Sequence, residues 1–164
     1  MPEPFDMSQV MDSDLDVSAN YARAFVTIDE RRYLAFMAKK LEAKANVETR
    51  DVLRLGTNIK GHKNGLVSFS GTMTIYKCTE IFDDALEKYT KTGVMPRFEV
   101  QVSNEDPQCS DQIGRTSKVF NKCILDGDIL LALADAEGGS IEQEINFFAE
   151  SMTRPEKYRN PAGM

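Results

Sequence analysis

The chain of 164 residues is predicted to fold as one mainly β domain of the α+β class, a small β-sandwich or barrel with one flanking helix. Three consecutive stretches support this prediction. Residues 66–76 alternate between apolar and mostly hydroxyl-bearing side chains, residues 81–89 place apolar side chains at helical spacing, and residues 98–102 alternate again. A period of two is typical of a strand, and a period of 3.6 of an amphipathic helix. A sheet face lined with small hydroxyls points towards assembly rather than catalysis.

The N-terminal residues 1–20 contain five acidic and no basic side chains, with prolines at positions 2 and 4. An uncompensated acidic run favours a solvated arm with little local order. We therefore divide the chain into a flexible arm (1–20), a β domain (21–150) and a C-terminal tail (151–164). Residues 23–28 should form the first strand, followed by a turn over residues 29–32.

Residues 36–56 set helix propensity against periodicity. Residues 36–45 are mostly good helix formers, yet polar and apolar side chains alternate from Lys40 to Glu48, with Lys39 as the exception. The alternation outweighs propensity because it decides which side chains share a face. The elements expected here are, in order, a long strand to about Val47, a turn at 48–51, a return strand at 52–55 and a mobile, glycine-punctuated loop at 56–65.

The second half of the chain begins with the helix, which should start at Ile81 and end at Gly93, with Pro96 beyond it. Asp126-Gly127 is typical of a two-residue type I′ hairpin turn. The other elements expected are, in order, a loop at 104–115, a strand at 116–125, a strand at 129–135, a turn at Gly138-Gly139 and a final strand at 141–147.

Composition excludes several function classes. A net charge of −6 and a pI of about 4.9 argue against a basic face that binds nucleic acid non-specifically. Three cysteines without Cys-x-x-Cys spacing indicate a reducing compartment rather than a disulfide framework. The sequence shows no signal peptide and no apolar run long enough to span a bilayer, so we expect no membrane association.

Residues that could carry chemistry are sparse. His62 is the only histidine, and a nucleophilic pair with one of the three cysteines would need an orienting residue that the sequence does not offer. Asp12-Ser-Asp14-Leu-Asp16 begins like a calcium loop but lacks its glycine and glutamate. Glu142 and Glu144 share one strand face, where carboxylates are typically surface charges. We predict no catalytic, cofactor-binding or metal-binding residues and no enzyme activity.

Several short segments occur in a characteristic order. They are Gly-His-Lys-Asn-Gly (61–65), Gly-Thr-Met-Thr-Ile-Tyr-Lys (71–77), Lys-Thr-Gly-Val-Met-Pro-Arg-Phe (91–98), Asn-Glu-Asp-Pro (104–107), Gly-Arg (114–115), Glu-Gln-Glu-Ile-Asn-Phe (142–147) and Pro-Glu-Lys (155–157). This ordered set resembles the tail tube proteins of contractile-tailed (PBSX-like) phages and phage-like bacteriocin particles, over roughly residues 22–158.

The resemblance implies a structural role in the virion. Six copies would close into a ring whose inner strands form a continuous β-barrel, and rings would stack into the inner tube of a contractile tail. A tail sheath protein would surround the tube, and baseplate and tail terminator proteins would meet its ends. DNA would pass through the lumen without specific binding. The protein would be made in the cytoplasm of a bacterial host.

Two sets of residues are candidates for positions in such a tube. Polar residues of the alternating strands are expected to face the lumen: Lys40, Glu42, Lys44, Ser68, Ser70, Thr72 and Thr74. Polar residues of the predicted turn and loop are expected to contact neighbouring subunits or rings: Asn46, Glu48, Arg50, Asp51, Lys60, His62 and Lys63.

Two other function classes remain as alternatives. A monomeric small-ligand-binding β-barrel would need an apolar cavity rather than a hydroxyl-lined face. A cysteine-dependent hydrolase would need His62 beside a reactive thiol.

Overall fold

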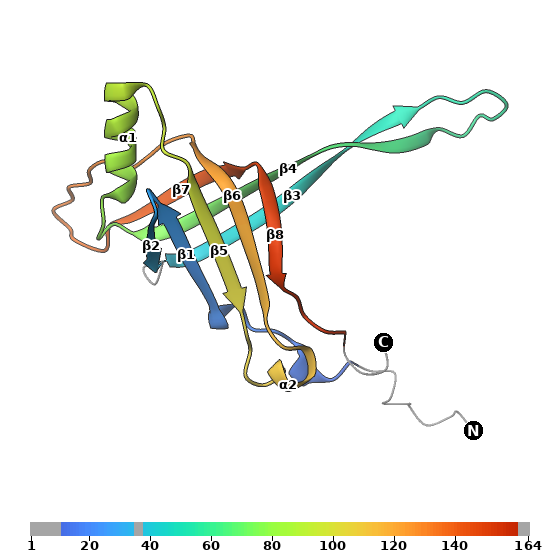
Figure 1. The fold of residues 1–164 in the computed structure, drawn as a ribbon, viewed down its shortest axis with the longest axis horizontal. Coiled ribbons are helices and arrows are strands. Elements are labelled where there is room, and N and C mark those ends of the chain that lie inside the picture. The colour runs from blue at the N-terminus through green and yellow to red at the C-terminus, as the bar shows by residue number, and fades with distance from the viewer. Residues whose placement is uncertain (1–10, 35–37, 161–164) are drawn as a thin grey trace.

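The computed structural model describes residues 11–34 and 38–160. A two-layered β body carries one helix at its edge, and a long hairpin projects from it (Figure 1). The described elements are, in order, β1 (Ala22–Ile28), β2 (Arg31–Leu34), β3 (Ala38–Val52), β4 (Gly61–Tyr76), α1 (Ile81–Thr92), β5 (Phe98–Asn104), α2 (Ser110–Ile113), β6 (Thr116–Asp126), β7 (Glu142–Ala149) and β8 (Ser151–Glu156). The mainly β fold with one flanking helix is confirmed.

The strands pair antiparallel in the order β2-β1-β5-β6-β7-β4-β3, and β8 pairs with β6. Strand β6 connects the two layers, because its first part pairs with β5 and β8 whereas residues 124–126 pair with β7. The register with β5 shifts between the pairs Phe98–Cys123 and Val100–Phe120, where Lys122 has a φ of 50°. A bulge of this kind bends a strand, which allows β6 to pass from one layer to the other.

The hydrophobic core lies between the layers and under α1. Its aromatic centre is a chain of edge-to-face contacts, with ring centroids 5.8 Å apart for Phe82–Phe98 and 6.0 Å apart for Phe98–Phe147. Such contacts stabilise aromatic pairs beyond the area that they bury. The ring of Phe147 also covers Gly71, its cross-strand partner, so closely that a Cβ at position 71 would overlap it. Gly71 therefore leaves the space that this ring fills.

Helix α1 confirms the predicted helix and its end. It buries Phe82 and Ala85, and Gly93 stops it in the left-handed conformation with a φ of 75°. The Gly93 N–H donates to the Tyr89 carbonyl at 2.8 Å. Glycine tolerates this conformation because it has no Cβ.

Strand β3 confirms that periodicity outweighs helix propensity in this segment. The exception at Lys39 also has a structural cause. The register shifts between Ala38, which pairs with Ile75, and Lys40, which pairs with Thr74. The extra residue at this shift is Lys39, whose Nζ lies 3.2 Å from Glu142 Oε1. The bulge thus keeps the alternation on both sides of a lysine that would otherwise point into the core.

The predicted turn at 48–51, the return strand at 52–55 and the loop over 61–65 are wrong. β3 continues to Val52 and β4 begins at Gly61, and these two residues pair with each other. The connection is the segment 53–60. The local turn residues do not turn the chain here, because cross-strand hydrogen bonds satisfy the backbone along both extended strands.

The strand predicted at 129–135 and the two-residue hairpin at Asp126-Gly127 are also wrong. Gly127 has a φ of 74° at the end of β6, but residues 127–141 form no regular strand before β7. Phe147 and Phe148 of β7 occupy the pairing positions beside the end of β6. An adjacent strand over 129–135 therefore has no place in the sheet.

Two further strands lie where the sequence suggested a turn and a tail. The turn over 29–32 is shorter than expected, because Asp29 and Glu30 turn the chain with φ values of 50° and 65° and β2 follows at once. Residues 151–156, assigned to the C-terminal tail, form β8 on the outer side of β6. The predicted strands at 23–28, 116–125 and 141–147 are confirmed as β1, β6 and β7.

Residues 11–20 of the predicted arm are described by the structure, and residues 1–10 lie outside the described residues. Single 3₁₀ turns occupy Ser13–Leu15 and Ala19–Tyr21. The buried carboxylate of Asp106 accepts the Ser18 N–H at 3.0 Å and the Gln108 N–H at 3.0 Å. These two hydrogen bonds, that from Ser18 first, lower the pKa of Asp106. One carboxylate thus tethers this segment to the body.

Candidate functional site

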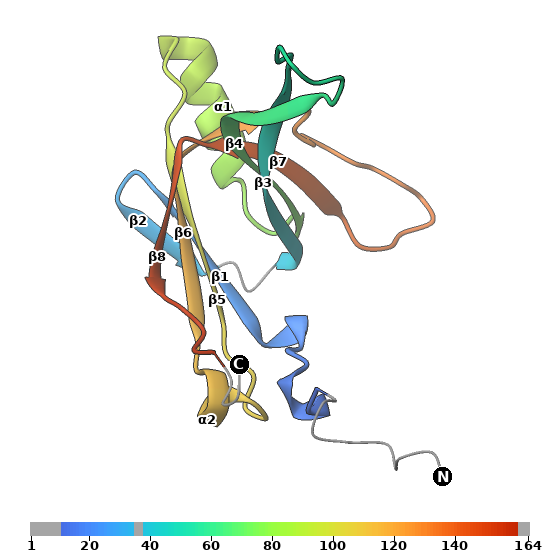
Figure 2. The same ribbon diagram turned by 90° about the vertical axis from the view of Figure 1, so that its right-hand side faces the viewer.

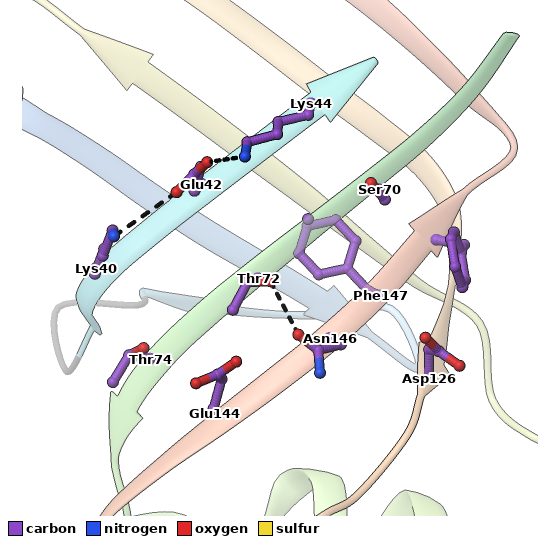
Figure 3. A pocket seen from close by; sticks show the side chains of 12 residues that line it. Lys40, Glu42, Lys44, Ser70, Thr72, Thr74, Asp126, Glu144, Asn146 and Phe147 are labelled. Carbon is purple, nitrogen blue, oxygen red and sulfur yellow. Dashed lines mark hydrogen bonds and ion pairs between the residues drawn. The ribbon is translucent and has the colours of Figure 1, made fainter. Parts of the chain in front are cut away.

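One face of the β3–β4–β7 layer is polar and concave. It opens to solvent over a volume of about 470 Å³ (Figure 3). Six of the seven predicted lumen-facing residues line it, namely Lys40, Glu42, Lys44, Ser70, Thr72 and Thr74. They share a face because alternate residues of β3 and β4 point to the same side of the sheet, while the others, such as Met73 and Ile75, point into the core. The seventh, Ser68, pairs with Asn46 farther along the same two strands.

The charges on this face neutralise one another locally. Glu42 lies between two lysines of its own strand, with Oε1 2.6 Å from Lys44 Nζ and Oε2 3.7 Å from Lys40 Nζ (Figure 3). The hydrogen bond and charge of Lys44, and then those of Lys40, lower the pKa of the Glu42 carboxyl, and Glu42 in turn raises the pKa of Lys44. Both shifts favour the charged forms of Glu42 and Lys44.

Strands β6 and β7 add residues that the sequence analysis did not assign to this face. Asp126, Glu144 and Asn146 line the same concavity, and Thr72 Oγ1 donates a hydrogen bond to Asn146 Oδ1 at 2.9 Å. The alternation over residues 141–147 already indicated that Glu144 and Asn146 share the polar face of a strand. The sequence could not show that this strand, β7, lies beside β4.

The predicted contact residues all lie on the projecting β3–β4 hairpin or at its tip. Arg50 pairs with Lys63 and Asp51 with His62 across the strands. Asp51 Oδ1 lies 3.1 Å from His62 Nδ1, and its Oδ2 lies 2.9 Å from Lys60 Nζ. Asn46 and Glu48 lie on the same exposed stretch of β3. The structure thus gathers these seven residues on one protrusion.

The apolar side chains of this hairpin were not among the predicted contact residues. The large hydrophobic side chains exposed there are Val47, Leu53, Leu55, Ile59, Leu66 and Val67. They follow no clear period because they fall on both faces of a twisted ribbon and on its connection. Exposed apolar side chains that cluster on a protrusion indicate a contact surface.

The structure offers little to the cysteine-dependent chemistry that was considered. Cys109 and Cys123 are buried, and burial raises the pKa of both thiols, that of Cys123 to about 12. A thiol with so high a pKa is a poor nucleophile at neutral pH. His62 bonds to Asp51 on the hairpin. Within residues 11–34 and 38–160, no cluster of three potential metal ligands is found.

The polar concavity differs from the apolar cavity of a lipocalin-type barrel, because it opens to solvent and charged and hydroxyl side chains line it. Phe82, Phe98 and Phe147 pack between the layers. In the described part of the chain, none of the helices combines the length and the apolar character needed to cross a bilayer.

Comparison with solved structures finds the same fold in tail tubes and related particles. A chain of the anti-feeding prophage cap, described as a tube terminating cap, is similar with a TM-score of 0.64 and 12% identity, over 92% of this chain and 97% of that one. A chain of the PVC sheath–tube complex, an extracellular contractile injection system in the extended state, gives 0.58 and 14%, over 92% and 98%. The SPP1 tail tube gives 0.56 and 12%, over 87% and 80%.

At the level of sequence, no curated protein matches the chain. The profile of one protein family does match, over residues 9–153, and that family is described as phage tail tube protein. The match begins inside the acidic segment, whereas the resemblance seen in the sequence began only at about residue 22. The match spans β1 to β7 and the start of β8, so the chain belongs to the phage tail tube protein family and is a structural subunit of the tail tube of a phage or phage-like particle.

Proposed function

We propose that this subunit is non-enzymatic and closes into hexameric rings that stack into the inner tube of a contractile tail. The observation that carries the proposal is the edge strand β3, which ends the sheet order and runs for 15 residues. A long unpaired edge invites pairing with another chain. In a ring, each β3 edge would pair with the neighbouring subunit, and the β3–β4–β7 layers would close into one barrel.

The polar concave face would then line the lumen. Lys40 and Lys44, the two cations of this face, both lie beside Glu42, and Asp126 and Glu144 add negative charge. DNA phosphates bind proteins chiefly through lysine and arginine. A lumen whose cations are already neutralised would allow DNA to pass without specific binding.

The outer surface of the ring would meet the other tail proteins. The exposed face of α1 carries Asp84, Glu87, Lys88 and Lys91. The helix packs through Phe82 on the core side of β4, opposite the polar concave face. We propose this outer side for the tail sheath protein, and the ends of the tube for baseplate and tail terminator proteins. The assembling unit is the domain proposed for residues 21–150, extended by β8.

Electron microscopy and sedimentation of the purified chain test the proposal. We expect sixfold rings or tubes above a critical concentration. Placing two prolines on the β3 edge, at Ala43 and Ala45, should abolish rings because proline cannot donate to a neighbouring strand. Circular dichroism of this variant should show the wild-type strand content, so that a loss of rings reports on the β3 edge and not on unfolding. A wild-type chain that stays monomeric at all concentrations and salt conditions would refute the proposal.

A further inference from the structure

The tip of the β3–β4 hairpin, residues 48–63, exposes apolar side chains far from the core. Leu53 is 85% exposed, Leu55 is fully exposed and Ile59 is 67% exposed. Exposing such side chains to water is unfavourable by about 25 cal/mol per Å² of apolar surface. In Figure 1 this tip lies at one end of the long axis of the molecule.

The loop between β6 and β7, residues 127–141, exposes a second set of apolar side chains. Leu131 and Leu133 are half exposed, and Ile141 is also exposed. The loop lies at the other end of the long axis from the hairpin tip in Figure 1, and Figure 2 shows it standing out from the body. The two apolar segments of one chain therefore cannot cover each other.

The two segments carry opposite charge. The charged residues of the loop are Asp128, Asp135 and Glu137, all acidic. The hairpin tip has four basic residues, Arg50, Arg54, Lys60 and Lys63, against the acids Glu48 and Asp51. The tip is thus net positive and the loop net negative, which makes them electrostatically complementary.

The cations of the tip are only partly neutralised within the chain. Asp51 lies beside Lys60 and His62. Arg50 and Lys63 lie directly opposite each other across the strands, and neither forms an ion pair with a carboxylate of the described chain. Like charges directly opposite are destabilising. A carboxylate from outside the chain would relieve this repulsion.

We propose that the hairpin tip of one copy docks on the β6–β7 loop of the next copy. The apolar side chains of the tip, Leu53, Leu55 and Ile59, would pack against Leu131 and Leu133. The basic tip residues would face Asp128 and Glu137. This inference rests on the proposed tube function and names the two surfaces that join its subunits. Because the surfaces differ and lie at opposite ends, the contact is head-to-tail and propagates from copy to copy.

Another surface could receive the tip. An apolar groove of about 920 Å³ lies between β1 and β3, and the charged residues that line it are Arg23, Lys39 and Lys40. Lys39 is paired with Glu142 and Lys40 lies beside Glu42, and no carboxylate lines the groove. The acidic loop, which offers carboxylates to the basic tip, is therefore the better partner. Charge exchange and disulfide trapping discriminate between the two surfaces.

Charge exchange tests the contact. The loop variant Asp128→Lys with Glu137→Lys and the tip variant Arg50→Glu with Lys63→Glu should each raise the critical concentration for assembly by about tenfold or more. The variant that combines all four changes should assemble close to wild type. A matched control, Glu30→Lys with Glu99→Lys, makes the same charge change on exposed residues elsewhere and should assemble normally.

The outcomes separate this contact from the tube function. Wild-type assembly with unchanged assembly of the loop and tip variants would overturn the contact alone, as would failure of the combined variant to recover. A wild-type chain that forms neither rings nor tubes would overturn the proposed function and the contact together. Circular dichroism of each variant should show the wild-type fold.

Disulfide trapping locates the contact directly. In a Cys78→Ser background, a Leu55→Cys chain mixed with a Leu133→Cys chain should form a covalent dimer under mild oxidation. A mixture of Leu55→Cys with Val94→Cys chains, the latter exposed on another surface, should not. If Leu55→Cys instead links to Lys39→Cys at the apolar groove between β1 and β3, the loop assignment is wrong.

Discussion

The body and the β3–β4 hairpin are built from the same two strands but are stabilised differently. In the body half of β4, Met73 is 1% exposed and packs in the core, whereas in the hairpin half Leu66 is 78% exposed. The body half is held by burial, and the hairpin half chiefly by cross-strand hydrogen bonds and by the ion pairs of Asp51. A segment that buries little adds little stability to the subunit and is available for contacts between subunits.

The largest effect should follow from removing the hairpin. Replacing residues 48–66 with Asn-Gly joins the paired residues Val47 and Val67 by a two-residue turn. We expect assembly to be lost completely, while the melting temperature of the subunit stays within a few degrees of wild type. Electron microscopy and thermal unfolding measure the two effects. An unfolded subunit, or tubes of normal length, would contradict the division between body and hairpin.

The body should respond in the opposite way to loss of a core side chain. Phe147→Ala removes a buried ring that contacts Phe98 and Gly71, and should lower the free energy of unfolding by about 3–5 kcal/mol. Phe148→Ala, one residue on and 43% exposed, is the matched control and should cost less than about 1.5 kcal/mol. Urea unfolding distinguishes them. Equal losses would mean that the core does not lie between the layers as described.

Two glycines of β4 sharpen the comparison within one strand. Gly71→Ala places a methyl group against the ring of Phe147 and should cost about 1–3 kcal/mol of unfolding free energy. Gly65→Ala, in the hairpin, finds Glu48 at an ordinary contact distance of 3.6 Å and should be nearly neutral. Urea unfolding of both variants measures the difference. A loss at position 65 as large as that at 71 would show that the hairpin is packed as tightly as the body.

The smallest effect concerns the N-terminal segment, which Asp106 tethers by accepting the Ser18 N–H, while Asn104 Nδ2 donates to the Ser18 carbonyl. The pKa of Asp106 is lowered in the folded chain, so its hydrogen bonds stabilise the tether fully above the unfolded-state pKa of about 4 and are lost as pH falls through the lower folded pKa. The protection of the amides of residues 11–21, measured relative to their intrinsic exchange rates at each pH, should therefore fall in acid. Asp106→Asn should show lower protection of these amides at neutral pH, with little change of that protection in acid, unlike the exposed control Asp111→Asn. Unchanged amide protection in Asp106→Asn would show that this carboxylate does not tether the N-terminal segment.

Some of the fold could be predicted from the sequence because the signals are local. The alternation of β3 and β4 placed six polar side chains on one face, and Gly93 ended α1 where expected. The positions of turns were less predictable. The glycines at 61 and 65 resembled a loop, yet both lie in β4 because β3 supplies a pairing partner along its whole length.

The candidate site likewise combines residues that could be predicted from the sequence with residues that could not. Lys40, Glu42 and Thr72 follow from a period of two, but Asp126, Glu144 and Asn146 join them only because β7 pairs with β4 and β6 changes layer near Lys122. Those neighbours are separated by about 70 residues in the chain, as Thr72 and Asn146 show. No local pattern encodes such a contact.

By itself, the sequence determined most of the strands, the helix α1 and the side chains that share a face, because these follow from the repeat of a few neighbouring residues. The tertiary structure decided how far each strand runs, where the chain turns and which surfaces stay open. These depend on partners distant in sequence, as when Val52 pairs with Gly61 across the end of the hairpin and β7 excludes a strand over residues 129–135. The exposure of Leu55 and Leu133, which defines the proposed contact between copies, is likewise visible only in the folded chain.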